Sequence, residues 1–276
     1  MSKRPNNENS LSAESSALTI RSTKVSNALE LLNKRDRELR SEFLVEGAHG
    51  VEEVIAANLA KQIFVTKEFA LANNVLMSKA ANARISIFET DPIAIEKLSE
   101  TLSPQGIVAV AAYVAKDLEK EDLLTANFVV ILSNVREPGN AGSIIRVADA
   151  AGADLVIFAG TCVDPHNGKV VRSSAGSIFN VKVRQADDVA ETLRALTQTN
   201  HNIYIADGNA QMSWSDIDLK NSVAWVLGNE AWGVSNEDAP VGQRVAIPIY
   251  GKAESLNVAT AAALCLYETA KSRAGN

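Results

Sequence analysis

Short apolar runs alternate with stretches of helical periodicity along most of the chain. In the first half, apolar runs occupy residues 43–47, 62–66, 85–89 and 106–114, and helical spacing covers 48–58, 70–81 and 92–100. Strands and helices that alternate at this spacing predict a small α/β domain over residues 21–115, which opens with a helical pattern from Lys24. Residues 1–20 are polar and rich in Ser and Asn, and we expect a disordered tail there.

The second half repeats the alternation after a charged segment. Residues 116–126 (KDLEKEDLLTA) lack β-forming character and predict a linker between two domains. Beyond it, strands are expected at 128–133, 154–158, 180–183, 202–206, 222–228 and 244–249, and helices at 140–151, 188–197 and after Asn257. The segment 159–174 is expected to be a loop. Residues 127–276 therefore predict a second α/β domain with a mostly parallel sheet.

Three loops of this second domain, 134–140, 228–235 and 250–257, each follow a strongly apolar strand. Ligands of open parallel α/β sheets bind in crevices at the carboxyl ends of the strands, so these loops are expected to meet. The last loop feeds a helix, and Ser255 is expected to cap its N-terminus. Free backbone N–H groups at such a helix start, together with a Ser hydroxyl and the Asn257 amide, predict a ligand site.

Composition narrows the class of protein. Hydrophobic residues make up 46% of the 276 residues and aromatic residues only 5%, which favours a core of Val, Ile, Leu and Ala. The sequence has no apolar run long enough to span a bilayer and no apolar block of a signal peptide. Its two cysteines lie far apart and outside any CxxC, so we expect no disulfide framework, no metal site and a cytoplasmic location.

The charge balance bears on nucleic-acid binding. A formal net charge of −6 argues against a protein that coats nucleic acid by charge alone, but it allows an enzyme that holds a few phosphates with a local patch. Residues 21–40 contain six basic and three acidic side chains. A solvated helix face and a phosphate-binding patch both remain open for this segment.

Common nucleotide and hydrolase motifs are missing from the sequence. No GxGxxG follows a strand, no GxxxxGK[ST] occurs, and no GxSxG is present, which argues against dinucleotide oxidoreductases, P-loop enzymes and serine hydrolases. No two of the three histidines have the spacing of metal ligands. His166 in DPHNGK is expected to be a solvated loop residue.

Two polar positions stand out beside the last loop. Asn140 can cap the helix expected at 140–151, and Arg146 follows within a largely apolar stretch, so it must be paired, solvated at a cleft, or extended along the helix surface. Glu230 comes directly after a strand in the loop GNEAWG. It could orient a cation such as Arg146 or a ligand hydroxyl, or it could be a solvated residue of an ordinary turn.

Taken together, the three loops resemble the SpoU-type (TrmH-like) RNA 2′-O-ribose methyltransferases of the SPOUT superfamily over residues 128–272. The matching motifs are NxGxxxR at Asn140–Arg146, LGxE at Leu227–Glu230, and IPxxGxxESLNVxxAxxxxLxE from Ile247 to Glu268. Their order and spacing make the resemblance specific. Residues 22–115 resemble, on pattern more than motif, the ribosomal-protein-like substrate-binding domain that precedes many of these enzymes.

The resemblance implies a C-terminal trefoil knot, a homodimer with its active site near the interface, and S-adenosylmethionine as cofactor. It places Leu227, Gly228, Ile247 and Leu256 around the cofactor. It assigns the transfer of a methyl group to a ribose 2′-oxygen to Arg146, Asn140, Glu230, Ser255 and Asn257. Arg172, Arg35 and Arg37 are candidates for contacts with the RNA backbone.

The resemblance leaves the substrate open. A separate N-terminal domain favours ribosomal RNA, most of all 23S rRNA, while a tRNA 2′-O-methyltransferase is the alternative. A non-catalytic RNA-binding protein of the same fold is a further alternative, against which the intact motifs argue. The modified nucleotide is not determined by the sequence.

Overall fold

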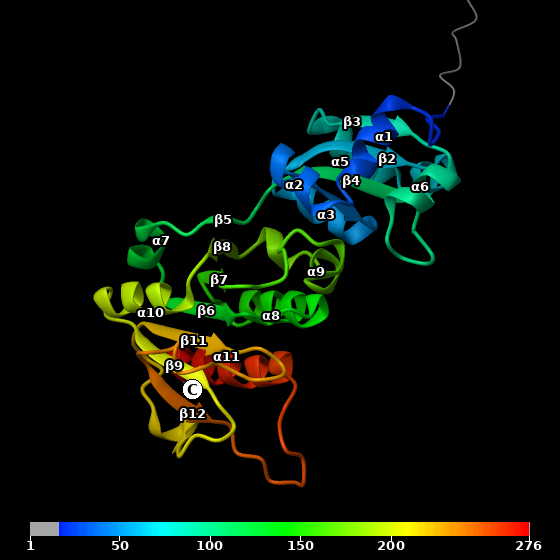
Figure 1. The fold of residues 1–276 in the computed structure, drawn as a ribbon. Helices are drawn as coiled ribbons and strands as arrows, with labels where there is room; N and C mark the ends of the chain where they lie inside the picture. The colour runs from blue at the N-terminus through cyan, green and yellow to red at the C-terminus, as the bar shows by residue number, and fades with distance from the viewer. Residues whose placement is uncertain (1–16, 276) are drawn as a thin grey trace, which may run out of the picture.

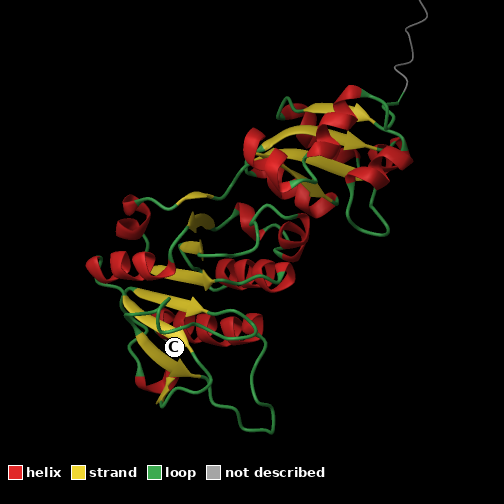
Figure 2. Cartoon of the chain, viewed as in Figure 1, coloured by secondary structure: helices red, strands yellow, loops and turns green. Residues whose placement is uncertain are grey.

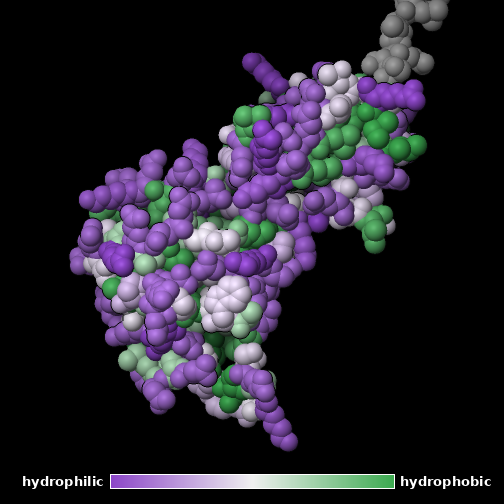
Figure 3. All heavy atoms as spheres, in the orientation of Figure 1, coloured by the Kyte–Doolittle hydropathy of each residue, from purple (hydrophilic) through white to green (hydrophobic). Residues whose placement is uncertain are grey.

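The computed structural model describes residues 17–275, which form two α/β domains (Figures 1 and 2). Most of the predicted tail, residues 1–16, lies outside the described residues. Leu18, near the end of the predicted tail, is ordered, because its N–H donates to the carbonyl of Glu89 (2.8 Å). Hydrophilic side chains cover most of the face visible in Figure 3.

The N-terminal domain is a four-stranded sheet with helices packed on it. Its strands are β1 (Glu42–Glu46), β2 (Ala60–Val65), β3 (Ser86–Glu89) and β4 (Ile107–Ala112), in the spatial order β1-β4-β2-β3. Its helices are α1 (Thr23–Glu30), α2 (Lys34–Arg40), α3 (Ala48–Ala56), α4 (Lys67–Ala72), α5 (Asn74–Asn82) and α6 (Pro92–Leu98). The single helix predicted at 70–81 is two helices, because the backbone of Asn73 leaves the helical region (φ −125°, ψ 46°).

The C-terminal domain is built on an eight-stranded sheet in the order β10-β12-β9-β11-β6-β7-β8-β5. Every pair of neighbouring strands in this sheet runs parallel, as predicted. The strands are β5 (Lys116–Asp117), β6 (Phe128–Ser133), β7 (Leu155–Ala159), β8 (Lys182–Ala186), β9 (Asn202–Ala206), β10 (Met212–Ser213), β11 (Val223–Leu227) and β12 (Gln243–Ala246). The helices are α7 (Lys120–Thr125), α8 (Pro138–Ala150), α9 (Gly168–Ser173), α10 (Val189–Gln198) and α11 (Val258–Ala274), with short 3-10 turns at Ser177–Phe179 and Trp214–Asp216.

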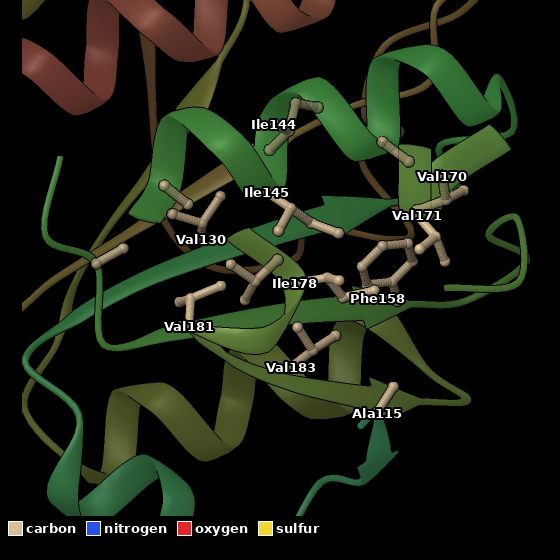
Figure 4. Close-up of a cluster of buried hydrophobic side chains, with 14 of the residues drawn as sticks. Ala115, Val130, Ile144, Ile145, Phe158, Val170, Val171, Ile178, Val181 and Val183 are labelled. Atoms are coloured by element: carbon tan, nitrogen blue, oxygen red, sulfur yellow. The ribbon is translucent and has the colours of Figure 1, made fainter. Parts of the chain in front are cut away.

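Alternate residues of the central strands face two separate cores. Val130 of β6 packs with Ile144 and Ile145 of α8 (Figure 4), and the same core includes Leu266 of α11. Val129, on the other face of β6, packs in the core beneath α10. This is the period-two alternation of a strand buried on both sides, and it places α8 and α11 together on the face that leads to the three loops.

Two predicted non-regular segments are structured. The expected linker 116–126 contains β5, which pairs with β8, and α7, whose Asp122 is buried and bonded by Arg184 (2.6 Å) and Lys182 (3.2 Å). Asp122 therefore has its partners in the C-terminal domain, and the segment contains regular structure that its composition did not predict. The expected loop 159–174 contains α9, which packs closely on α8 because Gly142 has no side chain to meet Ser173.

Candidate active site

A pocket of about 640 Å³ lies at the carboxyl ends of β9, β11 and β12. This size is ordinary for a site that takes a small molecule or cofactor. Two long segments and the end of β9 form its walls; the lining residues are Ala206–Asn209, Leu227–Val234, Arg244, Ile247, Ile249, Glu254–Val258 and Ala261. The pocket is therefore at the edge of the sheet where the parallel topology predicts a ligand site.

The four residues predicted to hold the cofactor, Leu227, Gly228, Ile247 and Leu256, all line this pocket. Gly228 has a steric reason to be glycine, since a Cβ atom there would lie 2.4 Å from the carbonyl carbon of Gly233. The two strands of the loop approach this closely because Asn229 and Gly233 exchange backbone hydrogen bonds of 3.0 and 2.8 Å. The tight turn after β11 shapes one pocket wall.

Three polar side chains, one from each motif, form a hydrogen-bonded chain at the pocket. The amide of Asn140 donates to Oε1 of Glu230 (3.0 Å), and the amide of Asn257 donates to Oδ1 of Asn140 (3.0 Å). Glu230 and Asn257 line the pocket, and Asn140 links them from α8. The expectation that the three loops meet is confirmed by these contacts.

The helix caps differ from the predicted ones. The N-cap of α11 is Asn257, whose side-chain oxygen accepts from the N–H groups of Ala259 (2.9 Å) and Thr260 (3.3 Å). Ser255 lies two residues upstream, where its hydroxyl is too early to reach those N–H groups, and it lines the pocket as an exposed residue. Likewise Glu137, not Asn140, caps α8, which leaves the Asn140 side chain free for the pocket network.

Arg146 lies outside this pocket. It is exposed on α8, six residues beyond Asn140, and forms no ion pair with any residue in the range 17–275. Glu230 accepts from the amide of Asn140 rather than from Arg146, the cation that the sequence suggested for it. Arg146 can therefore act in catalysis only if the substrate, or a second subunit that carries it, reaches this exposed side chain.

Two of the three arginines predicted to bind RNA are engaged within the protein. Arg37 is buried and pairs with Asp164 (2.6 Å), an arrangement that does not favour the predicted contact with RNA. Arg172 binds Glu46 and Glu100 (3.0 Å), which joins α9 to the N-terminal domain and occupies its guanidinium. Arg35 is exposed on α2, and its role in RNA binding stays a prediction.

His166 is buried rather than solvated, contrary to the sequence-based expectation. Its Nε2 accepts from the N–H groups of Val114 and Ala115, both at 3.2 Å, and its ring stacks on Tyr113. Burial lowers the pKa of His166, although the carboxylate of Asp164 opposes this. The imidazole therefore helps to join the two domains, and no local pattern could have indicated this because its partners are backbone groups 51 and 52 residues away.

Some residues of the pocket were missed by motif matching. Trp232 lines the pocket from the loop 228–235, and Arg136 of the loop 134–140 lies over its ring. Asp207, directly after β9, and Arg244, within β12, form an ion pair (2.8 Å). The sequence could have indicated Trp232, because a tryptophan is unusual in a loop of mostly small and polar residues.

The SpoU rRNA Methylase family matches residues 127–267, and the MRM3-like substrate binding domain matches residues 22–109. The chain belongs to the SpoU rRNA methylase family. It is 33% identical to the 23S rRNA (guanosine(2553)-2′-O)-methyltransferase RlmP of Bacillus subtilis, over 90% of this chain and 96% of that protein. It is 30% identical to the 23S rRNA (uridine(2479)-2′-O)-methyltransferase of Streptomyces viridochromogenes, over 93% and 92%.

Solved structures agree with this assignment. The SpoU methyltransferase AviRb from Streptomyces viridochromogenes, in complex with AdoMet, superimposes with a TM-score of 0.81 at 27% identity and covers 92% of this chain and 100% of its own. An AdoMet-bound rRNA methyltransferase from Sinorhizobium meliloti gives a TM-score of 0.80 at 25% identity, with 93% and 98% covered. The predicted family and its α/β fold are confirmed.

The residues of the pocket fit S-adenosylmethionine. Leu227, Ile247 and Leu256 offer apolar walls, and the loop after β11 offers backbone groups. Three carboxylates, those of Asp207, Glu230 and Glu254, outnumber the single guanidinium of Arg244 among the lining side chains. This excess of negative charge suits a cofactor with a sulfonium cation. Within residues 17–275, no group of three or more potential metal ligands occurs and no helix is long and apolar enough to cross a membrane.

Proposed function

We propose that this enzyme methylates a ribose 2′-hydroxyl in 23S ribosomal RNA with S-adenosylmethionine as methyl donor. The observation that carries the proposal is the hydrogen-bonded chain Glu230–Asn140–Asn257 at the cofactor-sized pocket. It joins all three motifs at one place, and the named relatives are 23S rRNA 2′-O-methyltransferases. A tRNA substrate remains the alternative.

The bound cofactor supplies an electrophilic methyl group on sulfur, so the protein's tasks are alignment and handling of the hydroxyl proton. Leu227, Gly228, Ile247 and Leu256 hold the cofactor in the pocket. The network fixes Asn257 and with it the start of α11, so that the nearby Ser255 hydroxyl can position the ribose. This division assigns cofactor binding to the walls and substrate orientation to the polar rim.

Arg146 binds the phosphate beside the target ribose and polarises the 2′-hydroxyl. A guanidinium stays protonated at ordinary pH, so binding an anion is the role its chemistry supports. Its exposed position on α8 is consistent with an active site completed by a second subunit. Leu264 and Tyr267, 39% and 55% exposed on the neighbouring α11, provide apolar surface that a homodimer would bury.

The trefoil knot is part of the proposal. The two segments that would form it, at residues 228–234 and 247–258, both line the cofactor pocket. A knot would keep these loops in place against each other without the need for a lid. It also explains a cofactor site built mainly from loops and backbone groups.

Methylation of purified RNA fractions with radiolabelled cofactor tests the proposal. We expect incorporation into 23S rRNA from cells that lack the protein, no incorporation into tRNA, and a nuclease-resistant 2′-O-methyl product. Arg146→Ala is expected to abolish transfer while calorimetric cofactor binding is retained. Arg194→Ala, an exposed arginine on α10 away from the pocket, is the matched control. Transfer to tRNA alone would select the alternative substrate, and cofactor binding without transfer to any RNA would contradict the proposed activity.

A further inference from the structure

One large aromatic side chain at the pocket belongs to none of the buried hydrophobic clusters of residues 17–275. Trp232 lines the pocket in the turn after β11, and it is 55% exposed. By contrast, Trp225 on the preceding strand is fully buried and its Nε1 donates to Thr269 (2.9 Å). An indole left in water beside a polar network contributes little to folding, and it offers a flat apolar face to a ligand.

A guanidinium accompanies this indole. The Cζ atom of Arg136 lies 5.3 Å from the ring centroid of Trp232, within the range of a cation–π contact. Arg136 is exposed and forms no salt bridge with any residue in the range 17–275. The carboxylate of the next residue, Glu137, pairs with Lys169 (2.6 Å), and Glu230 accepts from Asn140. The positive charge of Arg136 is therefore free for an anion from outside the chain.

The position of the pair relates it to the transfer site. Arg136 precedes Glu137, whose N–H donates to Glu230 (3.4 Å), and Trp232 follows Glu230 by two residues. Both side chains therefore lie close in the sequence to residues that bond to the network joining Asn140 and Asn257. A ligand held by the pair would lie at the mouth of the pocket, on the side of Glu230.

We propose that Trp232 and Arg136 form a nucleotide clamp for the RNA substrate, in which the indole stacks on a nucleobase and the guanidinium binds an adjacent phosphate. Unstacked bases of single-stranded RNA bind aromatic and arginine planes in this way, largely independently of base identity. The clamp holds the target nucleotide or its neighbour beside the 2′-hydroxyl to be methylated. This inference rests on the proposed function.

Steady-state kinetics separate the clamp from a cofactor contact, since Trp232 lines the same pocket. For Trp232→Ala we expect the KM for RNA to rise roughly tenfold, within the range that loss of one base–aromatic stack produces, and the Kd for S-adenosylmethionine to change less than twofold. Trp232→Phe should recover most of the loss because it keeps an aromatic face. Arg136→Ala should raise the RNA KM and reduce the salt dependence of RNA binding by about one phosphate contact. Unchanged RNA KM in Trp232→Ala, or a parallel rise in the cofactor Kd, would overturn the clamp.

Fluorescence gives a readout that does not require turnover. In a Trp214→Phe variant the remaining tryptophans are the buried Trp225 and the exposed Trp232. We expect RNA oligonucleotides to quench this variant and to leave the Trp214→Phe/Trp232→Phe control unquenched. Equal quenching of both variants would contradict stacking. Quenching of the Trp214→Phe variant but not of its control, together with a wild-type protein that methylates no RNA, would reject the proposed function and keep the clamp, so the two failures are distinguishable.

Discussion

Arg37 and Asp164 form a buried ion pair between the two domains, with side chains only 7% and 9% exposed and 2.6 Å between Nη2 and the carboxylate. Arg37 also donates from Nε to the same carboxylate and from Nη1 to the carbonyls of Leu31 and Leu32 (both 3.0 Å). Its partner lies at the start of the segment that carries His166 and α9. The N-terminal domain is thereby anchored to the loop that packs against α8.

Removing this pair is expected to weaken the domain junction. Arg37→Ala leaves the Asp164 carboxylate buried without its guanidinium, and breaking one side of a buried pair typically costs about 3–5 kcal/mol. We expect the free energy of unfolding from urea titration to fall by this order. Arg35→Ala, on the same helix but exposed, should change it by less than about 0.5 kcal/mol. A small effect of Arg37→Ala would show that the junction depends on its apolar contacts instead.

The free energy of unfolding should also decrease as the pH falls below about 6.5, the ordinary pKa of a histidine in an unfolded chain. Burial lowers the pKa of His166, and its neutral Nε2 accepts two backbone N–H groups. Between the lowered pKa and the ordinary value of about 6.5, the unfolded state binds the proton more strongly, so His166 stabilises the fold above about pH 6.5 and loses this contribution as the pH falls.

Thermal unfolding between pH 8 and pH 5.5 measures this effect. His166→Gln keeps an acceptor without titrating, and its Tm should depend less on pH than the wild-type Tm. Burial also lowers the pKa of His201, which is present in both proteins and cancels in the comparison. Burial alone would raise the pKa of Asp164, but hydrogen bonds from His166 and Arg37 lower it to about 2, so its own contribution is lost only as the pH falls from the ordinary value of 3.8 towards 2, below the range of this experiment. Identical pH profiles would contradict the assigned role of His166.

The pocket wall offers a matched pair of glycine substitutions. Gly228→Ala places a Cβ atom 2.4 Å from the backbone of Gly233 and must open the turn that lines the pocket, whereas a Cβ atom at Gly208 meets nothing within 4 Å. We expect calorimetry to show at least a tenfold weaker affinity for S-adenosylmethionine in Gly228→Ala. Gly208→Ala, which lines the same pocket, should bind the cofactor nearly as the wild type does.

Ser255 and Asn257 should separate helix capping from catalysis. Asn257→Ala removes the N-cap of α11 and the bond to Asn140, so we expect a loss of about 1 kcal/mol in stability along with activity. Ser255→Ala removes no capping bond, and its Tm should equal that of the wild type while kcat falls. If Ser255→Ala lowers the Tm as much as Asn257→Ala does, the proposed positioning role of the Ser255 hydroxyl loses its support.

The sequence by itself determined the buried strands of the C-terminal domain and the three loops that form the site. Apolar runs such as 128–133 specified buried parallel strands, because a strand covered on both faces needs apolar side chains at every position. Residue types at fixed spacing, such as Asn140, Gly228 and Glu230, identified the family and the loops that meet. These features are readable because each depends on neighbours in the sequence or on a repeated motif.

The tertiary structure decided which polar side chains are free. Arg37, Arg172 and His166 looked like solvent-facing or RNA-binding residues, yet each finds its partner across the domain junction, 50 or more residues away. The charged segment 116–126 likewise became strand and helix because Lys182 and Arg184 compensate Asp122. The charge and polarity of a side chain determine which groups it can bind. Only the packing of distant segments determines whether its partner is water, substrate or another residue of the protein.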